Sequence, residues 1–212
     1  MKKRILSFGL ALVMLAGLCV AASASNGFSD VSEQAWYADA VQYVAENHLM
    51  SGVGEDRFAP DVTMTRSMAV TVLHQLAGSP EPQGENPFTD IADDAWYTNA
   101  VLWAVENNIT SGSSATTFSP DAAVSREQLV TFLYQYAWLA ELHMTAEDIS
   151  SFSDFDQISD FAVPAFEWAA SAGIVSGDEQ NRVCPTQSVT RAQCAAMLMK
   201  FHQLIQQNSA AV

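Results

Sequence analysis

The sequence predicts a mainly α-helical protein in which three helix-loop-helix repeats surround a central three-helix bundle. A Phe-[Ser/Thr]-Asp opening occurs three times, and each copy is followed by a [Ser/Thr]-Arg step at Arg66, Arg126 or Arg191. Each repeat is expected to contain two helices with one apolar stripe apiece, and a single helical pair cannot bury both stripes. We therefore expect the second helices of the three repeats to pack together at the centre.

The repeats align closely along the chain. The first two superpose at a constant offset of 60 residues without a gap, and the third follows at offsets of 64 and then 65, after one residue inserted before Phe161. This alignment places the repeats at residues 28–79, 88–142 and 152–205. Residues 78–87 contain three prolines and should separate the first two repeats, whereas residues 134–142 are expected to prolong the last helix of the second.

The first helix of each repeat is predicted from its apolar spacing. In the first repeat the apolar positions are Tyr37, Ala40, Val41, Val44 and Ala45. This i, i+3, i+4, i+7, i+8 pattern indicates one buried helical face. The next aligned positions hold His48, Asn108 and Gly173, residue types that tolerate the left-handed backbone conformation at helix ends.

The second helices are expected to begin behind Thr65, Ser125 and Thr190, which are good N-cap residues. Gln128 and Gln193 occupy capping-box positions, whereas the first repeat has Met68 there. The three apolar stripes consist of Ala69, Val72, Leu73 and Leu76; Leu129, Phe132, Leu133 and Tyr136; and Cys194, Met197, Leu198 and Phe201.

Residues 1–24 are predicted to be a secretory signal peptide, because a basic start and an apolar run precede small residues that suit cleavage. A lipoprotein anchor on Cys19 is disfavoured, since Leu18 and not a small residue stands before it. No other apolar run is long enough for a membrane helix. We therefore expect an exported protein without a membrane span.

The charge balance narrows the classes of partner. Beyond residue 24 there are six basic and 24 acidic residues, a formal net charge of −18. Nucleic acids and anionic membranes both require a basic surface, so neither is an expected partner. Three of the six basic residues are the repeated arginines, which indicates a role for that position in folding or in binding.

The sequence predicts no enzyme, metal site or cofactor. No histidine recurs at the equivalent position of another repeat, and the four histidines do not have the spacing of metal ligands. Cys184 and Cys194 are ten residues apart and could pair in an oxidising compartment, but Cys194 also occupies a core position. Whether they form a disulfide, and whether Ca²⁺ has a role, stays open.

Two interpretations of the arginines are possible. Each follows an N-cap residue, where backbone N–H groups are unpaired and the helix dipole is positive, and its planar fork matches a carboxylate. This favours a repeated anion-binding site. Alternatively, each arginine forms a salt bridge with an acid of a neighbouring repeat, such as Asp30, Asp90 or Asp154, and fastens the repeats together. Both roles can coexist in one groove.

The tryptophans suit a carbohydrate partner, because sugar rings stack on aromatic faces. Trp36 and Trp96 occupy equivalent positions at the start of the first helices, where sugar binding and core packing are equally good interpretations. Core packing is favoured for Trp103 and Trp168.

Together, the Phe-[Ser/Thr]-Asp opening, the Trp-Tyr pair, the Ser-Gly pair, the Phe-x-Pro loop and the Thr-Arg step resemble the S-layer homology domain, here in three tandem copies from Phe28 to about His202. The resemblance implies a pseudo-threefold spindle at the cell surface, and because three internal repeats already complete the central bundle, we expect a monomer. The grooves between the repeats would bind an anionic secondary cell-wall polysaccharide, and similar modules recognise pyruvylated amino sugars through the arginine. By position, the implied ligand-binding residues are Arg66, Arg126, Arg191, Asp30, Asp90, Asp154, Gly52, Gly112, Gly177, Trp36 and Trp96.

This chain departs from the family pattern, since no repeat keeps the glutamate of the family's Thr-Arg-Ala-Glu. The third repeat also has Phe161-Ala162 for Trp-Tyr and Val183 for the loop phenylalanine. We therefore expect the strongest sites around Arg66 and Arg126 and the weakest in the third repeat. The alternative function is a structural surface-layer component, or an adaptor that binds other surface-layer proteins without recognising glycan.

Overall fold

The computed structural model describes residues 27–54 and 56–210, so the predicted signal peptide lies outside the described residues. The described chain is mainly α-helical and contains no extended strand, which confirms the predicted fold class. Its α-helices are α1 (Ala38–Glu46), α2 (Arg66–Leu76), α3 (Thr98–Glu106), α4 (Arg126–Leu139), α5 (Val163–Ser171) and α6 (Arg191–Ala210). Two short 3-10 helices, η1 (Phe155–Gln157) and η2 (Asp160–Ala162), occupy the region where the third repeat has its inserted residue.

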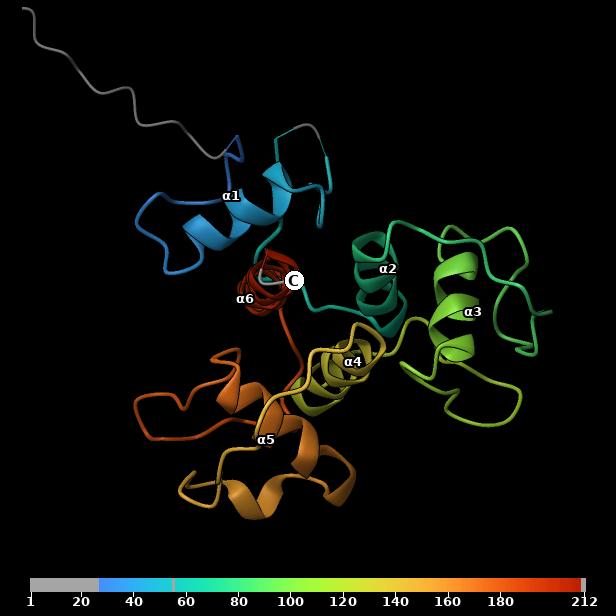
Figure 1. The fold of residues 1–212 in the computed structure, drawn as a ribbon. Helices are drawn as coiled ribbons and strands as arrows, with labels where there is room; N and C mark the ends of the chain where they lie inside the picture. The colour runs from blue at the N-terminus through green and yellow to red at the C-terminus, as the bar shows by residue number, and fades with distance from the viewer. Residues whose placement is uncertain (1–26, 55, 211–212) are drawn as a thin grey trace, which may run out of the picture.

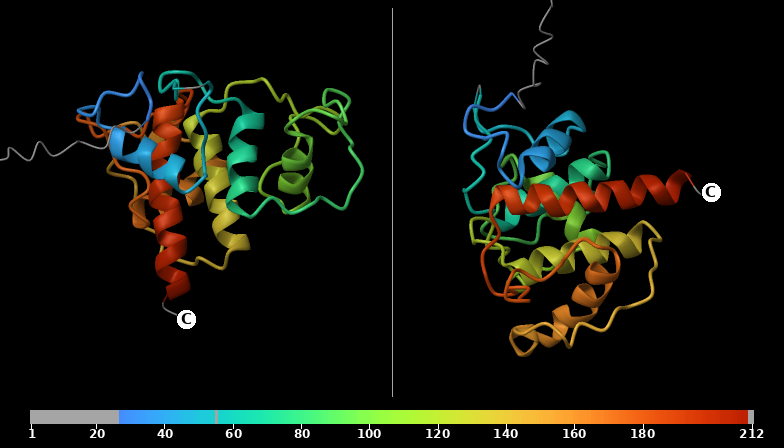
Figure 2. Two further views of the ribbon diagram at one scale, coloured as in Figure 1. Left: turned by 90° about the horizontal axis from the view of Figure 1, so that it is seen from above. Right: turned by 90° about the vertical axis from the view of Figure 1, so that its left-hand side faces the viewer.

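The second helices of the repeats lie at the centre, as expected. Figure 1 shows α2, α4 and α6 close together, with α1, α3 and α5 around the outside, and Figure 2 shows the three central helices running side by side. Each outer helix packs against the central helix of the preceding repeat: α3 on α2, α5 on α4, and α1 on α6. The contact between α1 and α6 joins the first repeat to the third, so the repeats form a closed cycle.

A ring of backbone hydrogen bonds closes the same cycle beside the N-termini of the central helices. Met64 N–H donates to the carbonyl oxygen of Val189 at 2.8 Å, Val189 N–H to that of Val124 at 3.1 Å, and Val124 N–H to that of Met64 at 3.0 Å. These three side chains occupy equivalent positions and are fully buried. Each repeat thus donates one of these hydrogen bonds and accepts another. Together the three bonds satisfy backbone groups that a single repeat would leave unpaired.

The helix boundaries follow the predicted signals. Thr65 Oγ1 accepts the N–H of Met68 at 3.2 Å, whereas Ser125 and Thr190 form full capping boxes with Gln128 and Gln193. The backbone is left-handed at the predicted helix ends, with φ values of 56°, 57° and 67° at His48, Asn108 and Gly173. Local side-chain chemistry therefore sets where these helices start and stop.

Trp103 and Trp168 are each 4% exposed, which confirms their predicted place in the core. Cys194 is buried among the apolar residues of α6, and burial raises the pKa of its thiol to about 12. Cys184 is partly exposed, and both thiols are free. The possible disulfide is therefore absent from the structure.

Candidate functional site: cavities at the repeat junctions

The repeated aspartates hold the loop that precedes each central helix. Asp30 accepts the backbone N–H groups of Phe58 and Ala59, both at 2.8 Å. Asp90 and Asp154 make the equivalent bonds in the other repeats. In each loop the second donor has a left-handed backbone, with φ values of 58°, 60° and 50° at Ala59, Ser119 and Cys184. Because non-glycine residues rarely adopt this conformation, the aspartate stabilises a strained turn.

We expect these carboxylates to make stability depend on acid pH. Burial raises the pKa of Asp30 and Asp90, but the loop N–H groups outweigh it, so each pKa lies below its usual range. Such a group stabilises the fold above its unfolded pKa of about 3.9, and this contribution is lost as pH falls through the lower folded pKa. Urea midpoints measured from pH 7 to pH 2 should therefore fall more steeply for the wild type than for an Asp30→Asn/Asp90→Asn double variant. Parallel profiles would contradict the assignment.

Two repeated arginines reach across a junction into the loop of the next repeat. Arg66 Nε donates to the carbonyl oxygen of Phe118 at 3.0 Å, and its Nη2 to that of Ser111 at 2.9 Å. Arg191 makes the same pair of bonds to Phe58 at 2.8 Å and Ser51 at 2.6 Å. Each guanidinium also lies over the loop phenylalanine ring, 4.7 Å from its centroid for Arg66 and 4.6 Å for Arg191. These arginines therefore fasten neighbouring repeats.

The predicted salt bridges from the repeated arginines to Asp30, Asp90 or Asp154 are not present among the described residues. Among the described residues, the only ion pairs within 4.0 Å are Arg57 with Asp30 and Arg182 with Asp178. Arg66 and Arg191 donate instead to backbone carbonyl groups of the loops whose N–H groups donate to Asp90 and Asp30. One loop residue is thus held from both sides, which explains why the arginine and the aspartate recur together.

Arg126 is the exception. Its Nε is buried and has no hydrogen-bond partner among the described residues, and its Nη1 lies 4.0 Å from the sulfur of Met197. Burial lowers its pKa, opposed by the charges of Cys184 and Asp154. A buried donor without an acceptor is unfavourable, so Arg126 retains hydrogen-bonding capacity that Arg66 and Arg191 have already used.

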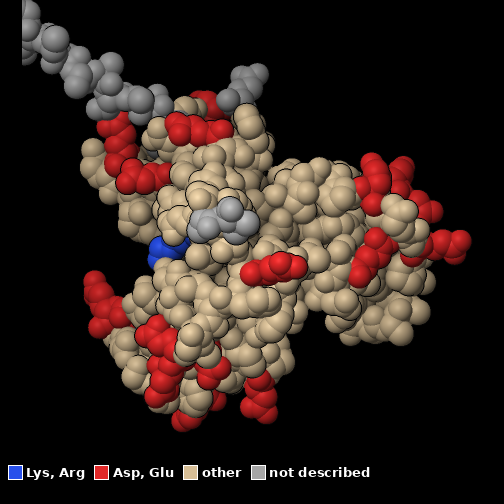
Figure 3. Space-filling view, viewed as in Figure 1, with Lys and Arg blue, Asp and Glu red and all other residues tan. Residues whose placement is uncertain are grey.

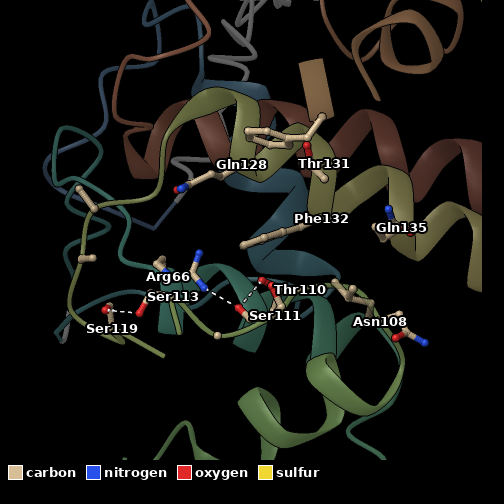
Figure 4. A pocket seen from close by; sticks show the side chains of 15 residues that line it. Arg66, Asn108, Thr110, Ser111, Ser113, Ser119, Gln128, Thr131, Phe132 and Gln135 are labelled. Carbon is tan, nitrogen blue, oxygen red and sulfur yellow. Dashed lines mark hydrogen bonds between the residues drawn. The ribbon is translucent and has the colours of Figure 1, made fainter. Parts of the chain in front are cut away.

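A cavity lies at each junction, and each contains one repeated arginine. The largest, of about 590 Å³, contains Arg66; cavities of about 230 Å³ and 160 Å³ contain Arg126 and Arg191. Figure 4 shows the first: Arg66 on α2 points toward the 110–113 loop, while Gln128, Thr131, Phe132 and Gln135 on α4 form the opposite wall. Each cavity therefore combines an arginine from one repeat with a loop and a central helix from the next.

In two of these cavities, an aromatic residue from the remaining repeat completes the lining. Phe161 lines the Arg66 cavity, and Trp96 lines the Arg191 cavity. Trp36 and Trp96 are 69% and 66% exposed, which excludes the core-packing interpretation. Because the cavities are composite, Phe161 and Val183 of the third repeat belong to the Arg66 and Arg126 cavities. These two departures from the family pattern were expected to weaken a groove of the third repeat. They lie instead in the Arg66 and Arg126 cavities, which were expected to be the strongest sites.

The repeated glycines permit close turns in the same loops. A Cβ on Gly52 would lie 2.7 Å from the carbonyl oxygen of Arg57, and one on Gly112 would lie 2.6 Å from that of Thr117. Gly112 and Gly177 line the Arg66 and Arg126 cavities. By contrast, Asp30, Asp90 and Asp154 line none of the three cavities and contact loop backbone. The predicted site residues therefore separate into cavity-lining residues and loop supports, apart from Trp36, which lines none of the three cavities.

Sequence reasoning missed the polar wall supplied by the central helices. Thr131 and Gln135 line the Arg66 cavity, and Thr71 and Gln75 occupy the equivalent positions in the Arg191 cavity. The recurrence of Thr and Gln at an offset of 60 residues was a usable signal. In α6 the same positions hold Ala196 and Lys200, so the third central helix presents a different surface.

The cavities exclude unpaired acids, although the protein is strongly acidic. No Asp or Glu lines the Arg66 or Arg191 cavity. The Arg126 cavity contains Asp178, which pairs with Arg182 at 2.7 Å. On the face shown in Figure 3, acidic residues gather on the outer parts of the lobes, and the centre is mostly uncharged. A cavity with an arginine and no free acid is suited to an anionic group.

The fold and these cavities define a three-repeat protein with one arginine-containing cavity at each junction. The S-layer homology domain model matches residues 27–69, 87–130 and 151–195. The chain belongs to the S-layer homology domain family.

Similar proteins include both surface-layer proteins and enzymes. The surface-layer 125 kDa protein of Lysinibacillus sphaericus is 30% identical over 195 residues, which cover 90% of this chain and 16% of that protein. The S-layer protein sap of Bacillus anthracis is 24% identical over 202 residues, 93% of this chain and 24% of its own length. Exoglucanase XynX of Acetivibrio thermocellus is 27% identical over 172 residues, 81% of this chain and 16% of the enzyme. The chain thus spans less than a quarter of each of these relatives.

Residues 27–54 and 56–210 contain neither a group of three or more His, Cys, Asp or Glu residues that could hold a metal ion nor a helix long and apolar enough to cross a membrane.

Proposed function

We propose that this protein binds non-covalently to the cell wall at the cell surface, by recognising an anionic secondary cell-wall polysaccharide in its junction cavities. The observation that carries the proposal is the composition of those cavities: an arginine and no unpaired acid in all three, with hydroxyl and amide side chains along the central helix of the Arg66 and Arg191 cavities. Exposed aromatic faces at Trp36, Trp96 and Phe161 suit the stacking of sugar rings. Family membership and the surface-layer relatives support the same role.

The anionic group is proposed to be a carboxylate carried by a sugar, such as a pyruvate ketal. A guanidinium donates two parallel hydrogen bonds to a carboxylate. Arg126 has the free capacity for this, because its guanidinium donates to no carbonyl group of the described residues. Arg66 and Arg191 already donate to two carbonyl groups each and contribute mainly charge. We therefore assign the principal anion contact to the Arg126 cavity.

Sedimentation with wall sacculi tests the proposal. The protein is expected to pellet with sacculi that retain their secondary polymer and to stay in the supernatant after the polymer is extracted. Sacculi that keep the polymer but have lost its pyruvyl groups distinguish the carboxylate from the sugar backbone. Equal pelleting with stripped sacculi would contradict glycan recognition and favour a protein-binding or structural role.

A further inference from the structure

A fourth cavity, of about 260 Å³, lies away from the repeated arginines. It is lined by Tyr134 and Trp138 of α4, by residues 142–144 and Ala146 of the following linker, and by Glu167 and Trp168 of α5. It contains no Lys or Arg and none of the residues assigned to the junction cavities. Its lining therefore requires a separate explanation.

Aromatic rings dominate this cavity. The rings of Tyr134 and Trp168 are 5.8 Å apart between centroids, those of Tyr134 and Trp138 are 6.2 Å apart, and His143 lies 4.4 Å from Trp138. Trp138 remains 54% exposed although it borders a cavity that could cover it. A linked series of aromatic faces with one open side is suited to a ligand that interacts with π-systems.

Two polar groups of the lining residues have no partner among the described residues, one partly exposed and one buried. The carboxylate of Glu167 has no hydrogen-bond or ion-pair partner among the described residues. The indole N–H of Trp168 is buried and has no acceptor there. The first group attracts a positive charge, and the second requires a hydrogen-bond acceptor.

The repeat architecture does not require these residues. At the junction of the first two repeats, the positions of Tyr134, Trp138 and Glu167 are occupied by His74, Gly78 and Leu102. His74 packs at that junction: its ring lies 5.2 Å from that of Trp103, and its Nε2 lies 2.8 Å from the carbonyl oxygen of Pro80. The same fold thus accepts other residue types at these positions, so the repeat architecture alone does not account for the aromatic rings and the carboxylate of this cavity.

We propose that the cavity bounded by Tyr134, Trp138, Glu167 and Trp168 binds an organic ammonium cation. The aromatic faces stabilise the cation through its attraction to their π-electrons, and Glu167 supplies the opposite charge. A hydroxyl group on the ligand would offer the acceptor that Trp168 lacks. This site is independent of the anionic glycan, because its charge preference is opposite and its residues are different.

Choline is the probe of choice, since it joins a trimethylammonium group to a hydroxyl. Its neutral isostere, 3,3-dimethyl-1-butanol, has the same shape without the charge. The protein has five tryptophans, so the indole N–H signals of ¹⁵N-labelled protein report each site separately. Choline is expected to shift the signals of Trp138 and Trp168 and to leave those of Trp36 and Trp96 in place. The isostere should bind about 10-fold more weakly, given typical cation–π energies.

Matched variants complete the test. Glu167→Gln should weaken choline binding about 5-fold or more, and Trp138→Ala should abolish the shift at Trp168 while leaving the fold intact, because Trp138 is largely exposed. Glu141→Gln removes an exposed acid of the same linker that does not line the cavity, so it should bind like the wild type. Equal affinity for choline and its isostere, equal shifts with a neutral sugar, or no shift at 50 mM choline would each overturn the proposal.

Discussion

Replacing Arg191 by alanine is expected to lower the free energy of unfolding by about 3 kcal/mol, because two hydrogen bonds from a charged donor are lost. Arg191 is 7% exposed, and it donates to the carbonyl groups of Phe58 and Ser51. These bonds join the third repeat to the first, which are far apart in sequence. The variant therefore weakens the closure of the cycle as well as one local contact. Urea denaturation, followed by circular dichroism, measures the change.

Arg57→Ala is the matched control. Arg57 lies next to Phe58 in the same loop, and its Nε is 3.5 Å from Asp30, but its side chain is 66% exposed. Exposed ion pairs typically contribute less than about 1 kcal/mol, so this variant should unfold near the wild-type midpoint. If the two variants lost equal stability, the buried arginine would not be a fastener, and the carbonyl bonds would have no special role.

The repeat pattern predicted the fold well because its signals are local. N-cap residues, left-handed helix ends and apolar stripes act within a few residues of their own position, and the structure has them where expected. The packing of each outer helix on the preceding repeat's central helix could not be read in this way. It depends on how whole helices fit together, and an alignment that superposes repeats carries no information on which repeat touches which.

The candidate site was predictable only in part, for the same reason. The sequence singled out the arginines and Trp96, which line the junction cavities, and it placed the grooves between repeats, but it assigned the departures of the third repeat to a groove of that repeat. In the structure an arginine, a loop and an aromatic from three different repeats meet in the Arg191 cavity. A substitution in one repeat, such as Phe161, therefore alters a cavity whose arginine belongs to another.

The inequality of the three arginines yields the sharpest prediction on binding. Arg126→Met should weaken the binding of the anionic wall polymer by about 10-fold or more, the effect of losing a charged, bidentate contact. It should leave stability unchanged or slightly raised, since a partly buried cation whose buried Nε has no acceptor is replaced by an unbranched apolar side chain. Wall sedimentation and urea denaturation of the same variant measure both quantities.

Arg191→Met is expected to have the opposite pattern of effects on binding and stability, so it serves as the comparison for Arg126→Met. Its guanidinium is already bonded to the protein, so the substitution should reduce stability much more than it reduces polymer binding by the molecules that remain folded. Arg126→Lys, which keeps the charge without the planar fork, should recover only part of the binding. If Arg126→Met bound the polymer like the wild type, the free Nε would not mark the ligand contact. If both variants lost binding and stability in the same proportion, the repeated arginines would share one role. The missing carbonyl partners of Arg126 would then not distinguish it from Arg191.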